Sequence, residues 1–348
     1  MKINIKTTKA AILTRLRKPL IIDEINLPES LSENQVLVEL IYSGVCGSQI
    51  GEIDGVKGPD KYLPHLLGHE GIGYVLSVGK NVNKVKKGDK VLLHWMVSKG
   101  KSSIPPVYKW KNKNLNAGLI TTFNFHTVVS QTRITKINNN LNDLDALLLG
   151  CTASTAIGSA IKLSNLQTKD IVAVSGCGPI GLYIIKILKF MNIKKIIAID
   201  INDKKLNTAK SYGANFIFNS KQKNFNILKE KFLMGFDYFF ECTGNSQVIS
   251  QAFEVLNKAG SQILIGVPKY KSKSYFNTLE INLGKKIIGC KGGNFDPDND
   301  FKKFFKIIQN KSLKRNNIIK NKIKLYEIND LINDTRKGKV VGKSIIVY

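Results

Sequence analysis

Hydrophobic and polar positions follow two different patterns along the chain. Up to about residue 40 the apolar runs are short, as in Leu20–Ile22 and Val36–Leu40, and none has the length of a helix. Short β-branched runs separated by turn residues are typical of antiparallel strands. From Thr152 to Phe295, longer helix-length segments alternate with strand-like runs, as a parallel α/β sheet requires. The pattern therefore predicts a β-rich, barrel-like domain followed by an α/β domain.

The most informative stretch runs from residue 171 to residue 200. A β-branched run, Ile171–Val174, is followed by the turn GCGPIG at Gly176–Gly181 and then by an apolar segment too long for a strand. A second β-branched run, Ile196–Ile199, ends at Asp200. The glycine motif alone is also typical of an ordinary turn. The order of strand, glycine turn, helix, strand and acid favours a Rossmann dinucleotide site.

Each residue of this turn has a physical task. Gly176 allows the tight turn, Gly178 lets a pyrophosphate approach the backbone, and Gly181 lets the helix lie close to the strand. Pro179 suits the first helical turn, whose N–H groups have no helical partner and attract phosphate. Asp200 is placed to accept hydrogen bonds from ribose hydroxyls and to repel a 2′-phosphate, so the sequence predicts NAD rather than NADP.

Length and composition limit the protein class. A chain of 348 residues is long enough for two domains, and no apolar run approaches the ~20 residues that span a bilayer. The basic first residues lack the apolar core of a signal peptide. Five cysteines, an odd number in a long chain, do not suggest a disulfide framework. We therefore expect a cytoplasmic protein with free or metal-bound thiols.

The formal net charge of +27 admits two explanations. A strongly basic chain can bind nucleic acid or an anionic membrane. However, the lysines are spread along the whole sequence instead of forming one patch with interleaved aromatic residues. We therefore favour a compositional explanation and expect no specific nucleic-acid partner and no membrane partner, although the charge can attract anionic substrates.

Two glycine-rich segments of the first domain carry candidate metal ligands. Cys46 lies within Ser43–Gln49, and His69 and Glu70 lie within the sequence GHEG that begins at residue 68. A lone cysteine or histidine is more often a structural residue than a ligand. A thiol, an imidazole and an acid, each held in a glycine-rich turn, are the groups that a catalytic zinc site needs.

With these motifs together, the sequence resembles the zinc-dependent alcohol dehydrogenase branch of the medium-chain dehydrogenase/reductase family. The resemblance implies an α/β fold, with a Rossmann doubly wound parallel sheet and a β-rich GroES-like barrel catalytic domain. It places the catalytic domain at 1–152, completed by 295–348, and the NAD-binding domain at 153–294. The matching segments cover nearly the whole chain: GVCGSQ (44–49), GHEGIGYVLSVGKNVNKVKKGDKV (68–91), GCTASTAIGSA (150–160), GCGPIG (176–181), AIDINDKKLNTAKSYGAN (198–215), FECTGN (240–245) and ILIGVP (263–268).

The resemblance also implies roles for single residues of the catalytic site. Cys46, His69 and Cys151 would be the three zinc ligands, with water or substrate oxygen in the fourth position. Glu70 would be a nearby acid, behind the ligands or transiently one of them. Ser48 would hydrogen-bond the alcohol and begin a proton relay.

Cofactor contacts are implied in the same way. Thr155 and Ile180 would pack near the nicotinamide, and Lys205 would lie beside the adenosine ribose. Backbone groups of Gly266, Val267 and the following proline would bind the carboxamide. Relatives form dimers or tetramers, so we expect a homodimer or a homotetramer.

Three departures from the family pattern change this picture. Gln49 replaces the Asp that orients the zinc-bound histidine, so its effect on the metal is open. Gly51 replaces the histidine of the proton relay, so the proton needs another route, such as ribose and water. Gly47 and Ile346 stand where some members have arginines that bind the pyrophosphate.

The polar stretch 97–118 bears on the zinc count and on the substrate. Many relatives carry a four-cysteine zinc lobe here, but this stretch has no cysteine, so we expect one catalytic zinc and no structural zinc. Trp95 and Trp110 either line a substrate cleft or pack within loops. We interpret His94 and His126 as structural, with a place in the cleft as the alternative for His94.

The sequence thus predicts an NAD-dependent, zinc-containing alcohol dehydrogenase, in which the metal and the nicotinamide come from different domains. A primary alcohol, a hydroxymethyl–thiol adduct, or a polyol, sugar or cyclitol are all open as substrates, and the polar insert and lysine excess favour polar ones. One alternative is a zinc-free quinone or enoyl reductase of the same fold. The other is a non-catalytic protein that binds a dinucleotide or nucleic acid.

Overall fold

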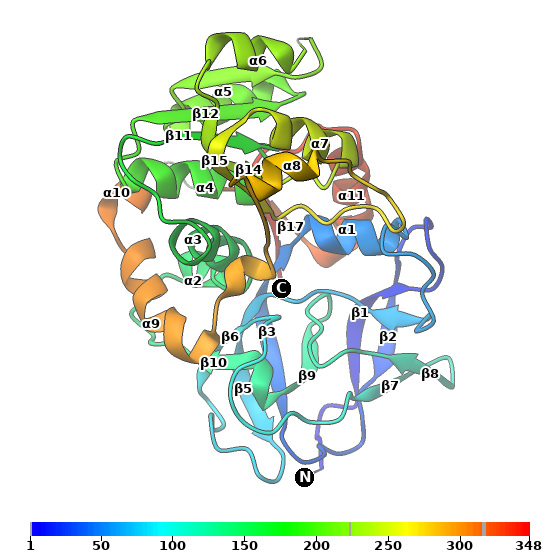
Figure 1. Cartoon of the computed structure of the whole chain (residues 1–348). Helices are drawn as coiled ribbons and strands as arrows, with labels where there is room; N and C mark the ends of the chain where they lie inside the picture. The colour runs from blue at the N-terminus through cyan, green and yellow to red at the C-terminus, as the bar shows by residue number, and fades with distance from the viewer. Residues whose placement is uncertain (1, 223, 315–317) are drawn as a thin grey trace. The chain divides into compact units, whose positions relative to one another are not determined.

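The computed structural model describes residues 2–222, 224–314 and 318–348. It divides into two compact units (Figure 1). The first comprises Met1–Cys151, Asp296–Ile308 and Ile319–Tyr348, and the second comprises Thr152–Phe295 and Gln309–Ile318. The sequence places residues 309–318 in the first domain. The described part of this segment groups instead with the second unit, where the ammonium of Lys186 donates to the carbonyl oxygen of Leu313 at 2.6 Å.

A small closed barrel forms one part of the first unit. It includes a hairpin within the stretch 97–118, in which Tyr108 pairs with Leu115. Only these two residues of the hairpin are fully buried, so its strands leave little apolar signal in the sequence. The barrel strands, in spatial order, are β1 (Thr7–Leu13), β2 (Ile21–Asn26), β7 (Val107–Trp110), β8 (Lys113–Asn116) and β4 (His65–Leu66).

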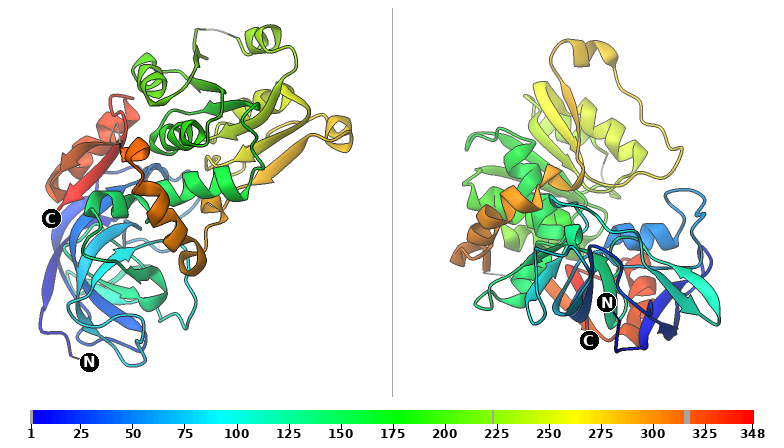
Figure 2. Two further views of the ribbon diagram at one scale, coloured as in Figure 1. Left: turned by 90° about the vertical axis from the view of Figure 1, so that its left-hand side faces the viewer. Right: turned by 90° about the horizontal axis from the view of Figure 1, so that it is seen from below.

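The second sheet of the first unit contains the C-terminal strand of the chain. This strand, β18 (Lys343–Val347), pairs antiparallel with β3 (Gln35–Val45), so Ser344 lies opposite Val45. Figure 2 shows it, in red, among the blue strands of the N-terminal part. The remaining strands are β5 (Gly71–Val78), β6 (Lys90–Leu93), β9 (His126–Ser130), β10 (Ile134–Lys136) and β17 (Ile319–Ile323).

The second unit is built on a six-stranded parallel sheet with helices packed around it (Figure 1). The middle residues of its strands at 171–175 and 195–200 are apolar and buried, as in strands that helices cover on both faces. The fold class predicted from the sequence, a Rossmann sheet plus a β-rich barrel domain, is confirmed. The strand order is β13 (Phe216–Asn219), β12 (Lys195–Asp200), β11 (Ile171–Ser175), β14 (Phe236–Glu241), β15 (Leu256–Leu264) and β16 (Lys286–Gly289).

Among the described residues, none of the helices combines the length and apolar composition of a membrane span. Helices of the first unit are α1 (Gly47–Ile53), α2 (Asp143–Leu148), α9 (Pro297–Ile308) and α11 (Ile328–Arg336). Those of the second unit are α3 (Thr152–Lys162), α4 (Pro179–Phe190), α5 (Asp203–Tyr212), α6 (Asn226–Lys231), α7 (Ser246–Glu254), α8 (Thr278–Asn282) and α10 (Lys311–Lys314). Short 3₁₀ turns lie at Gln131–Arg133, Gly292–Asn294 and Leu325–Glu327.

His94 is a structural residue of the first unit. It is completely buried; its Nδ1–H donates to the carbonyl oxygen of Met96 at 2.8 Å, and its Nε2 accepts from the Thr135 hydroxyl at 3.0 Å. Both ring nitrogens are therefore occupied, which leaves none for catalysis. Burial lowers the pKa of His94 from 6.5 to about 4.

The buried neutral imidazole predicts a pH dependence of stability. Below pH 6.5 the unfolded chain binds a proton at residue 94 that the folded chain takes up only near pH 4, so acid favours unfolding. Proton uptake at this residue should lower the free energy of unfolding by roughly 3 kcal/mol between pH 7 and pH 4. Urea unfolding at several pH values measures this effect. The free energy of unfolding should fall less steeply between pH 7 and pH 4 in H94Q than in the parent chain. Equal pH dependence of the two would contradict the assignment.

Candidate active site

Four side chains with metal-binding atoms converge in the first unit. Cys46 lies at the junction between β3 and α1, and His69 and Glu70 occupy the turn between β4 and β5. Cys151 directly precedes α3. One ligand atom from each residue lies within 4.8 Å of the others. The structure thus brings together three residues that we expected as ligands and the acid that we expected beside them.

The chemistry of these atoms fits a zinc ion. Nε2 of His69 is buried and has no hydrogen-bond partner among the described residues. Burying a polar atom without a hydrogen-bond partner costs free energy, so this nitrogen points to a bound ligand that supplies the missing interaction. Two thiols and an imidazole are ligands that zinc prefers, and three protein ligands leave a fourth position open, as in catalytic sites.

Mutual interactions shift the pKa values of these side chains. The hydrogen bond from the Cys151 thiol, against the effect of burial and with help from His69, holds the pKa of Cys46 well below its usual value. The same hydrogen bond, together with burial, raises the pKa of Cys151 well above its usual value. Burial lowers the pKa of His69, but the neighbouring Cys46 outweighs it and raises that pKa. Of the two thiols, Cys46 is therefore the one that loses its proton more readily.

A buried ion pair supports Glu70 from behind. The ammonium of Lys343 donates to Oε1 of Glu70, and both side chains are almost fully inaccessible, with exposed fractions of 1% and 0%. Burial raises the pKa of Glu70, and the positive charge of Lys343 opposes that rise. Sequence reasoning missed Lys343. Its only signal is a lysine at the start of an otherwise apolar terminal strand.

Glycines on both sides of Glu70 make room for its side chain. A Cβ atom on Gly44 would lie 2.5 Å from the Glu70 carboxyl carbon. A Cβ atom on Gly150 would lie 2.8 Å from Cβ of Glu70 and 2.7 Å from the carbonyl oxygen of Leu93. These two glycines come shortly before Cys46 and Cys151 in the chain. The metal-ligand motifs are glycine-rich because a buried carboxylate lies between them.

Ser48 and Gln49 have different surroundings. The Ser48 hydroxyl donates to Sγ of Cys46 at 3.3 Å, so it lies beside a proposed ligand. Oε1 of Gln49 accepts from the backbone N–H of Gly68, and its Nε2 donates to Glu52 at 3.3 Å. Gln49 therefore holds the backbone just before His69, whereas the family's Asp orients the histidine itself.

The predicted cofactor turn of the second unit has the expected local shape. Gly176 has φ of +84°, and its N–H donates to the carbonyl oxygen of Ile199 at 2.8 Å. The carboxylate of Asp200 accepts from the N–H of Cys177 at 2.7 Å, which places this acid directly at the turn. A Cβ atom on Gly181 would lie 2.0 Å from the Gly176 oxygen, whereas one on Gly178 would meet nothing within 4 Å.

The other predicted cofactor residues lie on several elements of the second unit. Pro179 and Ile180 begin α4, and Lys205 lies on α5. Gly266 and Val267 follow β15 at the carboxyl edge of the sheet, where β11 and β12 also end. Thr155 is buried on α3, which packs against α4.

Sequence reasoning also missed Glu241. It is buried at the carboxyl end of β14 and accepts from the N–H groups of Thr243, at 2.7 Å, and Gly244, at 3.1 Å. Its signal in the sequence is an acid at the end of a largely aromatic strand. It shapes the turn after β14, next to the turn that carries Gly266.

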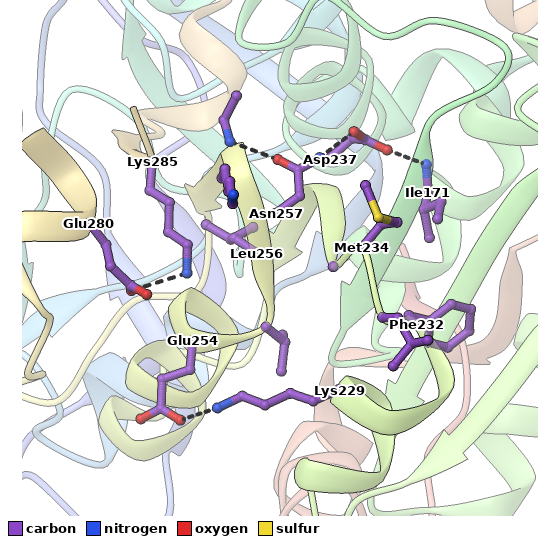
Figure 3. Close-up of a pocket in the computed structure, with 15 residues that line it drawn as sticks. Ile171, Lys229, Phe232, Met234, Asp237, Glu254, Leu256, Asn257, Glu280 and Lys285 are labelled. Atoms are coloured by element: carbon purple, nitrogen blue, oxygen red, sulfur yellow. Dashed lines mark hydrogen bonds and ion pairs between the residues drawn. The ribbon is translucent and has the colours of Figure 1, made fainter. Parts of the chain in front are cut away.

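A pocket of about 770 Å³ lies at the amino ends of the strands of the parallel sheet, opposite to the ends where the glycine turn lies (Figure 3). Its residues include Ile171 at the start of β11 and Asn257 at the start of β15. Ligands of open α/β sheets bind outside the carboxyl ends of the strands, so this pocket is not the cofactor site. Its charges also pair internally, Lys285 with Glu280 at 3.1 Å and Lys229 with Glu254 at 3.2 Å.

Comparisons with known proteins agree with this geometry. Residues 32–139 match the alcohol dehydrogenase GroES-like domain, and residues 179–310 match the zinc-binding dehydrogenase domain. The chain is 30% identical over 362 residues to S-(hydroxymethyl)glutathione dehydrogenase of Saccharomyces cerevisiae. The alignment covers 94% of this chain and 93% of the relative.

Solved structures share the fold. Benzyl alcohol dehydrogenase from Acinetobacter calcoaceticus superimposes with a TM-score of 0.86 at 22% identity, covering 99% of each chain. A short chain alcohol dehydrogenase from Escherichia coli CFT073, complexed with cofactor NADH, has a TM-score of 0.80 at 22% identity and covers 99% of this chain and 100% of its own.

Replacing Lys343 by Met should be strongly destabilising. It leaves the Glu70 carboxylate buried without its ion-pair partner, which costs roughly 3–5 kcal/mol. The double variant K343M/E70Q removes both charges and should recover much of that loss. Urea unfolding of the metal-free proteins measures both effects. If the two single losses, from K343M and from E70Q, simply add in the double variant, the ion pair is not the stabilising interaction.

Two alanine variants of the glycine turn should separate folding from cofactor binding. G181A forces a backbone clash and should cost about 1–3 kcal/mol of unfolding free energy. G178A meets no protein atom and should change stability by less than ~0.5 kcal/mol, but its methyl group should weaken NADH binding about tenfold or more. Thermal melting and NADH fluorescence titration make the comparison. Unchanged NADH affinity in G178A would show that the pyrophosphate lies elsewhere.

Proposed function

The chain belongs to the zinc-dependent alcohol dehydrogenases of the medium-chain dehydrogenase/reductase family, and from this premise we propose that it transfers a hydride between a polar alcohol and NAD. As a member of this family it is a zinc-type oxidoreductase of alcohols. The observation that carries the proposal is the convergence of Cys46, His69 and Cys151, with one ligand atom of each within 4.8 Å of the others. A zinc-free reductase needs no such cluster.

In this proposal, Cys46, His69 and Cys151 hold one zinc ion tightly, and the cysteine-free stretch 97–118 holds no structural zinc. Zinc, when bound, supplies a Lewis acid that stabilises negative charge on the alcohol oxygen. Glu70 stays behind the ligands because Lys343 binds its Oε1, and the two side chains together form a neutral ion pair in the wall of the site.

Ser48 is the proposed first member of the proton relay, in which its hydroxyl would accept the alcohol proton while it passes its own proton on. Its hydroxyl lies 3.3 Å from Sγ of Cys46, so it is next to a metal ligand. Gly51 has no side chain that could pass the proton on. We therefore propose that the proton leaves through the cofactor ribose and water.

NAD is the proposed cofactor, and its nicotinamide accepts the hydride. Asp200 supports NAD over NADP because its carboxylate already lies at the glycine turn, where it would repel a 2′-phosphate. Helix α4 presents its N-terminus to the pyrophosphate. The remaining contacts are proposed for Gly176, Gly178, Pro179, Ile180, Gly181, Lys205, Thr155, Gly266 and Val267.

A polar substrate is supported by a hydrogen-bond donor without a partner, on the segment that follows β6. Trp95 follows the end of β6, where Leu93 pairs with Gly71, the residue after Glu70. The indole N–H of Trp95 is buried and has no partner among the described residues. A substrate oxygen would satisfy it. Trp110, by contrast, already donates its N–H to Asp23 at 2.8 Å and packs within the barrel.

Two further observations favour polar substrates. The S. cerevisiae relative is named for S-(hydroxymethyl)glutathione, a hydroxymethyl–thiol adduct. The net charge of +27 favours anionic or strongly polar molecules. We propose a hydroxymethyl–thiol adduct, a polyol, a sugar or a cyclitol as the substrate class.

A homodimer or homotetramer is the proposed assembly. Apolar side chains lie exposed between β15 and β16 of the second unit, including Tyr275 (78%), Leu279 (62%) and Leu283 (71%). Clustered exposed apolar groups of this kind mark interaction surfaces. Sedimentation of a monomer at micromolar concentration would contradict this.

The decisive experiment follows NADH absorbance with a panel of polar and apolar alcohols. We expect NAD reduction that a zinc chelator abolishes and added zinc restores, and no activity in C46S. Polar alcohols should be the better substrates, and W95F, which lacks only the indole donor and some ring area, should raise their KM about tenfold while sparing benzyl alcohol.

Activity that survives chelation, with no bound zinc, would favour a zinc-free reductase. Reaction of simple apolar alcohols alone would overturn the polar-substrate proposal but not the reaction class. Absence of NAD reduction with every alcohol, together with salt-sensitive binding of random DNA, would favour a non-catalytic protein.

A further inference from the structure

A second group of metal-binding side chains lies in the first unit, outside the proposed catalytic site. It consists of Glu52 on α1, Asp60 in the loop after α1, and His65 at the start of β4. One ligand atom from each lies within 4.8 Å of the others. The exposed fractions of the side chains are 29%, 13% and 8%, so the group lies at the surface with its imidazole largely buried.

The hydrogen bonds of His65 leave one ring nitrogen facing oxygen atoms. Its Nδ1 lies 2.8 Å from the carbonyl oxygen of Leu66, and a carbonyl can only accept, so Nδ1 carries a hydrogen. Nε2 lies 2.8 Å from Oδ2 of Asp60 and 3.9 Å from Oε1 of Glu52. In a neutral ring, the lone pair of Nε2 would point at a carboxylate oxygen, and the two would repel each other. A cation must therefore lie at Nε2, either a second proton or a metal ion.

Each of the three side chains makes a hydrogen bond to a residue outside the group and has one further ligand atom directed toward the other two. Asp60 accepts from the N–H of Tyr62 at 2.8 Å through Oδ1, which leaves Oδ2 free for the group. Glu52 accepts from Gln49 at 3.3 Å through Oε2, which leaves Oε1. Metal-binding histidines and carboxylates typically have such supporting partners, which fix the orientation of the ligand atom.

Charge balance also favours a divalent ion over a proton. Two carboxylates and an imidazolium sum to one negative charge. The ammonium of Lys57 lies 3.8 Å from Oε2 of Glu52, but its side chain is 53% exposed, so this ion pair is weak. Two carboxylates, a neutral imidazole and a divalent cation sum to zero. Burial raises the pKa of Asp60, but the Tyr62 N–H and His65 outweigh it and hold that pKa below its usual value, so this ligand is a carboxylate at neutral pH.

We propose that Nε2 of His65, Oδ2 of Asp60 and Oε1 of Glu52 bind a second divalent cation, distinct from the ion held by the two cysteines. One nitrogen and two carboxylate oxygens suit zinc, and also manganese, cobalt or nickel. Three protein ligands at a partly exposed position leave coordination sites for water. The ion is therefore exchangeable, unlike one enclosed by buried thiolates.

Gln49 connects this second site to the proposed catalytic one. Its amide nitrogen donates to Glu52, and its amide oxygen accepts from Gly68, the residue before His69. An ion that fixes Glu52 therefore also fixes Gln49 and the backbone at His69. The second cation site would steady the histidine turn in place of the Asp that this chain lacks behind His69.

Metal stoichiometry of the intact chain tests the proposal. Protein dialysed against buffered free zinc should bind one tight equivalent and a weaker second one, measured by elemental analysis. H65Q and D60N should lose the second equivalent and keep the first. C46S should lose the first and keep the second. Thermal melting of each variant shows whether it remains folded, and E52Q offers a third, milder change in the same group.

Cobalt substitution distinguishes the two sites by their ligands. The first equivalent should give the intense near-ultraviolet thiolate-to-cobalt absorption, and the second should add only weak visible bands of a nitrogen and oxygen site. The second bands should be absent in H65Q and present in C46S.

Zinc binding that saturates at the first equivalent would overturn the proposal and assign a proton to Nε2 of His65. A second equivalent that persists in both H65Q and D60N would also overturn it, because the ion would then lie elsewhere. Neither result depends on alcohol oxidation, so failure of the second site and failure of the proposed reaction can be told apart.

Discussion

The buried ion pair between Lys343 and Glu70 joins segments from opposite ends of the chain. Lys343 begins the last strand, β18, and Glu70 lies in the turn that carries His69. A carboxylate this deeply buried is stable only with a partner, so the turn requires that β18 pairs with β3. That pairing puts Ser344 opposite Val45, next to Cys46. The cysteine–histidine cluster therefore depends on the C-terminal strand, although none of its ligands belongs to it.

Local features of the chain were predictable because they need only neighbouring residues. The glycine turn at Gly176–Gly181, the flanking strands and Asp200 follow from short-range backbone geometry and from apolar periodicity. The parallel sheet follows from the alternation of strands and helices. The grouping of Cys46, His69 and Cys151 needed more, since only a resemblance over nearly the whole chain connected residues so far apart.

The features that were missed depend on pairing between distant segments. Lys343 looked like one of many lysines until β18 placed it beside Glu70. The hairpin of β7 and β8 was hidden because only Tyr108 and Leu115 of its residues are fully buried, too few to produce an alternating pattern. For Gln49, the sequence showed which residue was replaced but not that its amide would hold the Gly68 backbone.

The substitutions around α1 are best understood together. An aspartate at position 49 would place a carboxylate close to Glu52, and the two negative charges would repel each other near the buried His65. A glutamine removes that charge while its amide donates to Glu52 and accepts from Gly68 at the same time. Glu52, Asp60 and His65 are then free to share a cation of their own. The loss of a charged residue behind His69 and the proposed second cation site are, on this argument, two consequences of one change in local charge.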